Sequence, residues 1–126
     1  MTPVRLQLSR RRGFSLQELS REANGLPAVN AARPSRWGNP YRVIKRHRMW
    51  FVRCSIAIYR PGCLTRAEAI AEAIEMFRLL MGTTEYQRDH DARELRGRNL
   101  ACWCALPALG EPDLCHAAIL LEIANS

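Results

Sequence analysis

Six residues near the end of the chain decide the predicted fold: Asn99-Leu100-Ala101-Cys102-Trp103-Cys104. Residues 99–103 form a short apolar run that is typical of a buried strand. A loop follows, and Asp113 stands where an N-cap is needed before a final apolar segment that runs to Ala124. We therefore expect the chain to end in a strand, a loop and a helix.

The segment before this unit has a helical pattern. Thr65 and Glu68 have the spacing of a capping box, which predicts a helix over residues 66–81. Residues 84–95 predict a further, polar helix that ends before Gly97. The core-facing stripe of the first of these helices is predicted to comprise Ala67, Ile70, Ala71, Ile74, Phe77 and Met81.

Strand patterns dominate the first half of the chain. A period of two in Val4, Leu6 and Leu8 predicts a first strand, and residues 28–32 predict a second, with a capped helix over 16–23 between them. Residues 41–59 predict a hairpin, with a helix beginning at residue 53 as the alternative. The turn of that hairpin carries the basic patch Lys45-Arg46-His47-Arg48. Strands separated by helices favour a small single-domain α/β sandwich, either Rossmann-like with three layers or built from two layers.

Length and composition narrow the class of protein. The chain has 126 residues, of which 48% are hydrophobic, and this fits one domain over residues 1–126 with one core. The longest uncharged apolar stretch, residues 117–121, is far shorter than the roughly 20 residues that cross a bilayer. No apolar run of signal-peptide length follows the first arginines, so we expect a cytoplasmic protein. Five cysteines in a reducing compartment indicate thiols or metal ligands before disulfides.

The net charge of +7 is unevenly distributed. Residues 1–60 hold 12 Arg and one Lys against two Glu, which gives +11, whereas residues 61–126 hold six Arg against ten acidic residues, which gives −4. The basic half is the candidate surface for a polyanion such as nucleic acid, or for a nucleotide phosphate. Codon bias in a GC-rich genome explains the preference for Arg over Lys equally well.

Four residues form a candidate metal site: Cys102, Cys104, Cys115 and His116. Positions i and i+2 of a strand project to one face, so the first two thiols point together. The other two residues lie at the start of the predicted last helix, and the set resembles the ligands of a tetrahedral Cys₃His zinc site. Adjacent helical residues diverge by about 100°, which argues against both Cys115 and His116 reaching one ion.

Two other interpretations of this cluster stay open. A thiol near a helix N-terminus is a potential nucleophile, so Cys115 and His116 are candidate catalytic residues, with His116 exchanging a proton. Alternatively, the cysteines are buried apolar residues without a chemical role. Cys54 and Cys63 have no comparable neighbours and are interpreted as structural.

The loop over residues 33–40 is the second candidate site. Glycine lets a backbone approach a ligand, an indole stacks on a base, and guanidinium groups bind phosphate. The candidate ligand-binding residues are Arg33, Arg36, Trp37, Gly38 and Asn39. The alternative is a rigid turn whose tryptophan covers the core. His47 and His90 stand among charged neighbours and are expected to be solvated.

Two blocks of sequence resemble the family known as domain of unknown function 4326, which is found in bacteria and their phages. One block combines residues 3–10 with residues 33–41, and the other combines residues 95–104 with Cys115-His116-Ala117 and residues 120–125. The resemblance implies that the Trp-Gly-Asn-Pro loop and the Cys/His elements form one composite site. This chain departs from the family pattern in a longer linker between Cys104 and Cys115, in Ala118 where aspartate is common, and in residues 13–27 and around His47.

These observations lead to two functional hypotheses. In the first, the loop and the Cys/His cluster form a pocket for a nucleotide, nucleoside or nucleic-acid end, with zinc as the candidate cofactor, in a hydrolase or transferase. In the second, the protein is a non-catalytic module, held together by zinc or by simple packing. Its basic half then binds nucleic acid or a phage or host protein.

Overall fold

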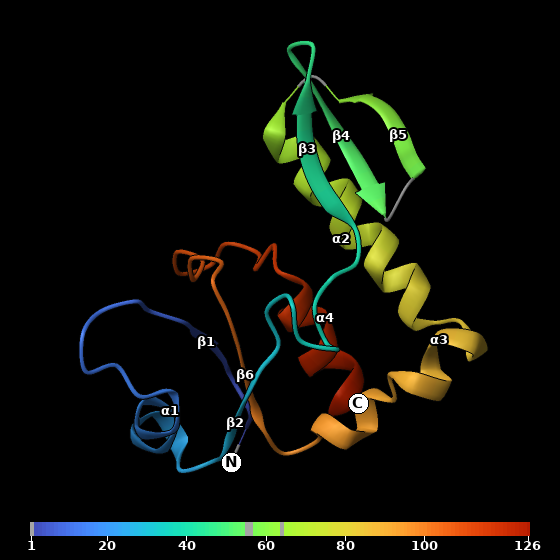
Figure 1. Ribbon diagram of the computed structural model, residues 1–126. Helices are drawn as coiled ribbons and strands as arrows, with labels where there is room; N and C mark the ends of the chain where they lie inside the picture. The colour runs from blue at the N-terminus through green and yellow to red at the C-terminus, as the bar shows by residue number, and fades with distance from the viewer. Residues whose placement is uncertain (1, 55–56, 64) are drawn as a thin grey trace.

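Three short parallel strands form the sheet at the base of the molecule (Figure 1). The computed structural model describes residues 2–54, 57–63 and 65–126. In this sheet β6 (Asn99–Cys102) lies between β1 (Arg5–Gln7) and β2 (Ala28–Asn30). Because β6 pairs in parallel with both neighbours, all three strands end at the same edge of the sheet.

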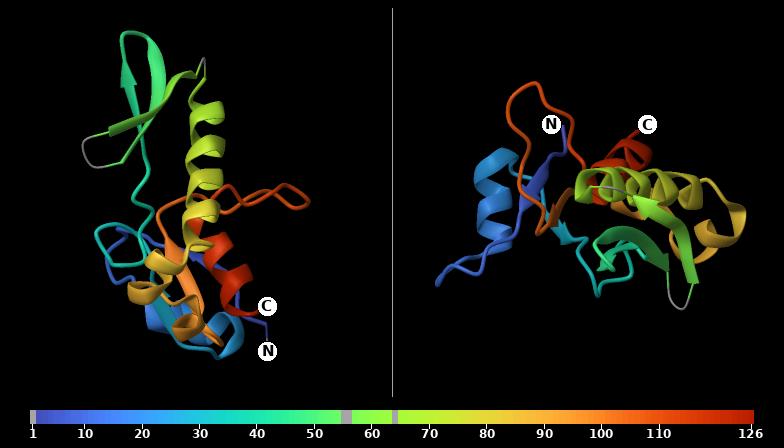
Figure 2. Two further views of the ribbon diagram at one scale, coloured as in Figure 1. Left: turned by 90° about the vertical axis from the view of Figure 1, so that its right-hand side faces the viewer. Right: turned by 90° about the horizontal axis from the view of Figure 1, so that it is seen from above.

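Helices cover both faces of the parallel sheet. Figure 2 shows α1 (Leu16–Asn24), which connects β1 to β2, on one side and α4 (His116–Ala124) on the other. The Ser15 side chain accepts a hydrogen bond from the backbone N–H of Glu18 and caps α1, as the sequence predicts. The α/β class and the strand, loop and helix at the C-terminal end are confirmed, and the likeness to a Rossmann fold stays a prediction.

A second, antiparallel sheet rises from the parallel one. It contains β3 (Arg42–Arg46), β4 (Met49–Cys54) and β5 (Ala57–Cys63), in that order. His47 and Arg48 form the turn between β3 and β4 with φ values of 53° and 66°, the left-handed conformation that tight hairpin turns require. The predicted hairpin and its basic turn are confirmed, and the alternative of a helix from residue 53 is wrong.

Helix α2 (Arg66–Met81) joins the two sheets. Its capping box forms as predicted, with Thr65 and Glu68 exchanging hydrogen bonds. The predicted stripe is only partly right, because Ala67 and Ala71 are exposed. The buried side chains are Ala69, Ala73, Phe77 and Met81. The first two pack against Val52 under the antiparallel sheet, and the last two join the core of the parallel sheet, so one helix serves two apolar clusters.

The predicted polar helix over residues 84–95 is wrong as a single element. The chain instead forms α3 (Thr84–Asp89) and a short 3₁₀ helix, η1 (Ala92–Leu95). His90 leaves the helical conformation with ψ 56°, and Asp91 caps the new turn by accepting from the backbone N–H of Arg93. The His90 ring stacks on Tyr86 at a centroid distance of 3.9 Å, so His90 is packed rather than solvated. None of the described helices is long and apolar enough to cross a membrane.

A buried amide fastens β6 to α1. Asn99 is fully buried, and its Oδ1 accepts from the backbone N–H of Val4 at 2.9 Å. Its Nδ2 donates to Ser20 Oγ at 2.7 Å and to Asn24 Oδ1 at 2.8 Å. Since these bonds link β1, β6 and α1, Asn99 sets where β6 begins and therefore where Cys102 lies.

Replacing Asn99 with leucine should lower the free energy of unfolding by about 3 kcal/mol, because the buried hydroxyl of Ser20 and the half-buried amide of Asn24 lose their partner. Denaturant-induced unfolding followed by circular dichroism measures the change. A loss below about 0.5 kcal/mol, the size usual for surface substitutions, would contradict this role of Asn99.

Candidate metal centre

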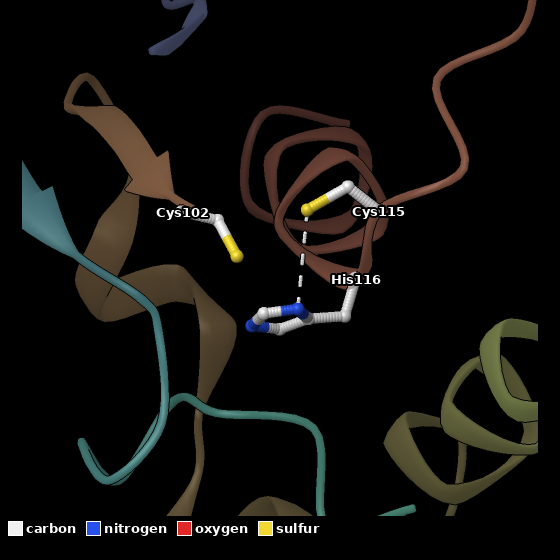
Figure 3. Close-up of side chains that lie close together, drawn as sticks. All are labelled: Cys102, Cys115 and His116. Atoms are coloured by element: carbon white, nitrogen blue, oxygen red, sulfur yellow. Dashed lines mark hydrogen bonds between the residues drawn. The ribbon is translucent and has the colours of Figure 1, made fainter. Parts of the chain in front are cut away.

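Cys102, Cys115 and His116 meet at the edge where the parallel strands end. Cys102 is the last residue of β6, Cys115 is the N-cap of α4, and His116 is the first residue of that helix. One sulfur from each cysteine and one ring nitrogen of the histidine all lie within 4.8 Å of one another (Figure 3). All three residues are buried, and their ligand atoms can hold a metal ion.

Cys115 and His116 converge although they are adjacent in sequence. Cys115 has φ −139° and ψ 138°, so it is extended rather than helical. The divergence of about 100° between neighbours applies only inside a helix, so it does not keep the side chains of Cys115 and His116 apart. The predicted cap at Asp113 is wrong, because the helix begins two residues later.

The hydrogen bonds of His116 determine which ring nitrogen faces the sulfurs. Its Nε2 lies 2.6 Å from the carbonyl oxygen of Ala31, which follows β2. A carbonyl only accepts, so Nε2 carries the proton and, in the neutral ring, Nδ1 presents a lone pair. Nδ1 lies 4.0 Å from Sγ of Cys115. Phe77 packs edge-on against the ring at a centroid distance of 5.5 Å and holds its plane.

Cys104 lies beside this group. Its Sγ is 3.8 Å from Sγ of Cys102, and the residue is exposed, unlike the other two cysteines. Hydrogen bonds from the thiols of Cys104 and Cys115 lower the pKa of Cys102. Hydrogen bonding with Cys102 raises the pKa of Cys104. Hydrogen bonding with Cys102 and Cys104 raises the pKa of Cys115. Hydrogen bonding within the cluster therefore favours ionisation of Cys102 over that of Cys104 and Cys115.

A buried arginine fixes the loop that carries these cysteines. Arg5 is only 8% exposed, although the alternating pattern assigns it to the polar face of the first strand, and Val4 is 38% exposed instead. Arg5 Nε donates to Asp113 at 2.6 Å, and Nη1 and Nη2 donate to the carbonyl oxygens of Cys104 and Ala105, each at 2.7 Å. The guanidinium thus holds both ends of the loop between β6 and α4.

The Cys/His cluster borders a cleft of about 650 Å³, which we call the metal-side cleft. Cys104 and His116 line one wall, and Arg33 and Asn39 of the loop before β3 line another. The structure therefore brings two of the loop residues and two of the candidate metal ligands together. Arg66 and Trp103 also line this cleft.

The other loop residues lie elsewhere. Trp37 is buried in the core of the parallel sheet at 7% exposure, and the guanidinium of Arg36 covers its ring at 4.6 Å. Arg36 pairs with Glu94 at 2.6 Å. Gly38 packs so closely that a Cβ there would lie 3.0 Å from the Cα of Arg33. Arg36 and Gly38 line a second cleft, of about 760 Å³, which we call the arginine cleft.

Trp103 is a further candidate binding residue, which was not among those expected from the sequence. It follows β6 directly, is 45% exposed and lies beneath the guanidinium of Arg10 at 5.0 Å. The signal was present, because Trp103 stands between Cys102 and Cys104 and side chains alternate along a strand. If the two thiols point inward, the indole between them points outward.

The comparisons with known proteins identify the family. The family model described as domain of unknown function (DUF4326) matches residues 16–126, so the chain belongs to this family. The match covers the loop and the Cys/His elements and begins after β1, so the opening residues 3–10 lie outside it. The searches of curated proteins and of solved structures found no match.

Replacing Arg5 with methionine should lower the free energy of unfolding by about 3 kcal/mol, because it leaves Asp113 and two carbonyl groups without their donor. Thermal or denaturant unfolding measures the loss. Arg93→Met is the matched control, since Arg93 pairs with Asp91 at the surface with 78% of its side chain exposed. Equal effects of the two substitutions would contradict the assignment of Arg5 as the clamp of the loop.

Proposed function

We propose that this member of the DUF4326 family binds a zinc ion through Cys102, Cys104, Cys115 and His116, and that the zinc centre forms one wall of a cleft for a nucleotide, nucleoside or nucleic-acid end. The observation that supports this most is the placement of the His116 ring: its Nδ1 lies 4.0 Å from Sγ of Cys115, its Nε2 lies against the carbonyl oxygen of Ala31, and Cys102 belongs to the same buried group. Histidine ligands of metals are usually oriented by such a bond from the other ring nitrogen.

The distances support a tetrahedral ion. Zinc binds sulfur at about 2.3 Å, and two sulfurs at tetrahedral positions are then about 3.8 Å apart. The Sγ atoms of Cys102 and Cys104 are separated by 3.8 Å. A set of three thiolates and one imidazole suits zinc better than magnesium or calcium, which prefer oxygen ligands.

The geometry favours ligand roles over catalytic roles for Cys115 and His116. Cys115 has no exposed surface, so a substrate carbon or phosphorus atom does not reach its sulfur. Both nitrogens of His116 are used, one by Ala31 and the other toward the thiols. Four protein ligands also fill a tetrahedral zinc site, as in structural centres. We therefore favour a binding protein over a hydrolase or transferase.

The metal-side cleft suits a ligand with a phosphate and a base. Its volume of about 650 Å³ lies in the range of small-molecule sites. Arg33 and Arg66 supply positive charge on its walls, and the exposed indole of Trp103 supplies a stacking surface. Burial and the nearby charge of Arg42 lower the pKa of Arg33, so both disfavour its charged form. An anion bound in the cleft would stabilise that charged form.

Protein purified without chelator should contain about one equivalent of zinc, because thiolate and imidazole ligands bind the ion tightly at neutral pH. Elemental analysis measures the content. Cys115→Ser and His116→Asn should each lose most of it. Cys54→Ser is the control, because Cys54 lies at the end of β4 and is not among the clustered ligands. Less than a tenth of an equivalent in freshly reduced wild-type protein would refute the zinc site.

A nucleotide, nucleoside or short oligonucleotide that fills the cleft should raise the thermal midpoint, and a ligand at 100 times its Kd adds about 2.7 kcal/mol. Trp103→Leu and Arg33→Gln should abolish this rise without loss of zinc. Leu109→Ala, a fully exposed residue outside the cleft, is the control. An undiminished rise in both cleft variants would place the ligand elsewhere.

A further inference from the structure

Among the residues that the structure describes, no helix packs on one face of the β3–β4 hairpin. Side chains alternate along a strand, so every second residue of β3 and its cross-strand partner share a face. On the face that packs against α2 lie Val43 and Val52. On the opposite side, which Figure 2 shows open to solvent, lie three cross-strand pairs, which we call the outer face: Arg42 with Arg53, Ile44 with Phe51, and Arg46 with Met49.

The outer face alternates cations with apolar groups. Arg42, Arg46 and Arg53 are exposed, and Ile44, Met49 and Phe51 between them are half-buried. Arg42 and Arg46 lie two alternations apart on β3 and project to the same side, so their guanidinium groups present two positive charges along one line of the outer face.

The stretch of chain that contains this face is basic. Residues 23–67 contain nine basic residues and no acidic residue. The arginine cleft opens at the base of the outer face, with Arg42, Ile44 and Arg53 in its lining together with Arg33 and Arg36. No acidic side chain lines this cleft among the residues that the structure describes.

We propose that the outer face and the arginine cleft bind single-stranded nucleic acid, with phosphates on Arg42 and Arg46 and an unstacked base on Phe51. Four residue steps along β3 separate the Cα atoms of the two arginines by about 13 Å, so the two positive charges are spread along one line, which suits a chain of phosphates better than a single one. The positive charge of these arginines favours the negatively charged phosphodiester backbone as the ligand.

The apolar groups select a single strand. Phe51 and Ile44 contact bases only if the bases are unpaired and turned toward the protein, because a duplex hides them between its strands. The six residues of the outer face are absent from the metal-side cleft, although the arginine cleft shares Arg33 and Asn39 with it. The variants that test the proposal therefore lie on the outer face alone, away from the zinc ligands.

Fluorescence anisotropy with a labelled 20-nucleotide single strand, as DNA and as RNA, tests the proposal on the full chain as purified. Arg42→Gln combined with Arg46→Gln should reduce the slope of log K against log salt by about 1.4, since each phosphate contact on a single strand contributes about 0.7. Phe51→Leu should weaken binding about fivefold or more with an unchanged slope, because it removes only stacking.

The matched control removes two charges from the other end of the molecule. Arg21→Gln combined with Arg98→Gln alters α1 and the residue before β6, and Figure 1 shows these elements far from the β3–β4 turn. This control should leave the slope and the affinity close to those of the wild type. Three results would overturn the proposal: no binding at about 50 mM salt, where phosphate contacts are strongest, a duplex bound as tightly as the single strand, or equal losses in the two double variants.

Discussion

The parallel pairing of β6 with both β1 and β2 is the constraint on which the candidate site depends. Parallel strands end at the same edge, and the connections that leave this edge carry the functional groups of many α/β proteins. Here β2 leads into Ala31 and the loop of residues 33–40, and β6 ends at Cys102. The pairing of β2 with β6 therefore brings together segments that are about 70 residues apart in sequence.

Burial then converts this proximity into a site with defined chemistry. His116 is the link, because its ring bonds to the carbonyl oxygen of Ala31 on one side and faces the thiols on the other. Arg5 holds the loop between β6 and α4 from the opposite direction through Asp113 and two carbonyl groups. A metal ion at the cluster would add a third fastening to the same loop. The cleft beside it would then have rigid walls, and preorganised walls lower the cost of ordering a ligand.

Local sequence patterns predicted where most helices and strands lie, but predicted less well which of their side chains are buried. Capping boxes and periodicity located α1, α2 and the hairpin. Of the four predicted metal ligands, the structure gathers Cys102, Cys115 and His116 into a group that could hold a metal ion, while a ligand role for Cys104 stays a prediction. Alternation failed at Arg5, since a guanidinium is buried only when a distant partner, here Asp113, satisfies it. The loop of residues 33–40 has no periodicity that decides between a stacking role and a core role for Trp37, because its burial depends on which elements pack together. The outer face of the hairpin became visible only once the cross-strand register was known.

X-ray absorption at the zinc edge of the purified protein tests the central claim most directly, because it reports the atoms bound to the ion. A Cys₃His centre predicts three sulfur neighbours at about 2.3 Å and one nitrogen neighbour at about 2.0–2.1 Å. Replacement of Cys104 by serine should leave two sulfurs in that shell. A first shell made mainly of oxygen or nitrogen, or one that keeps all three sulfurs in the Cys104 variant, would contradict the assignment.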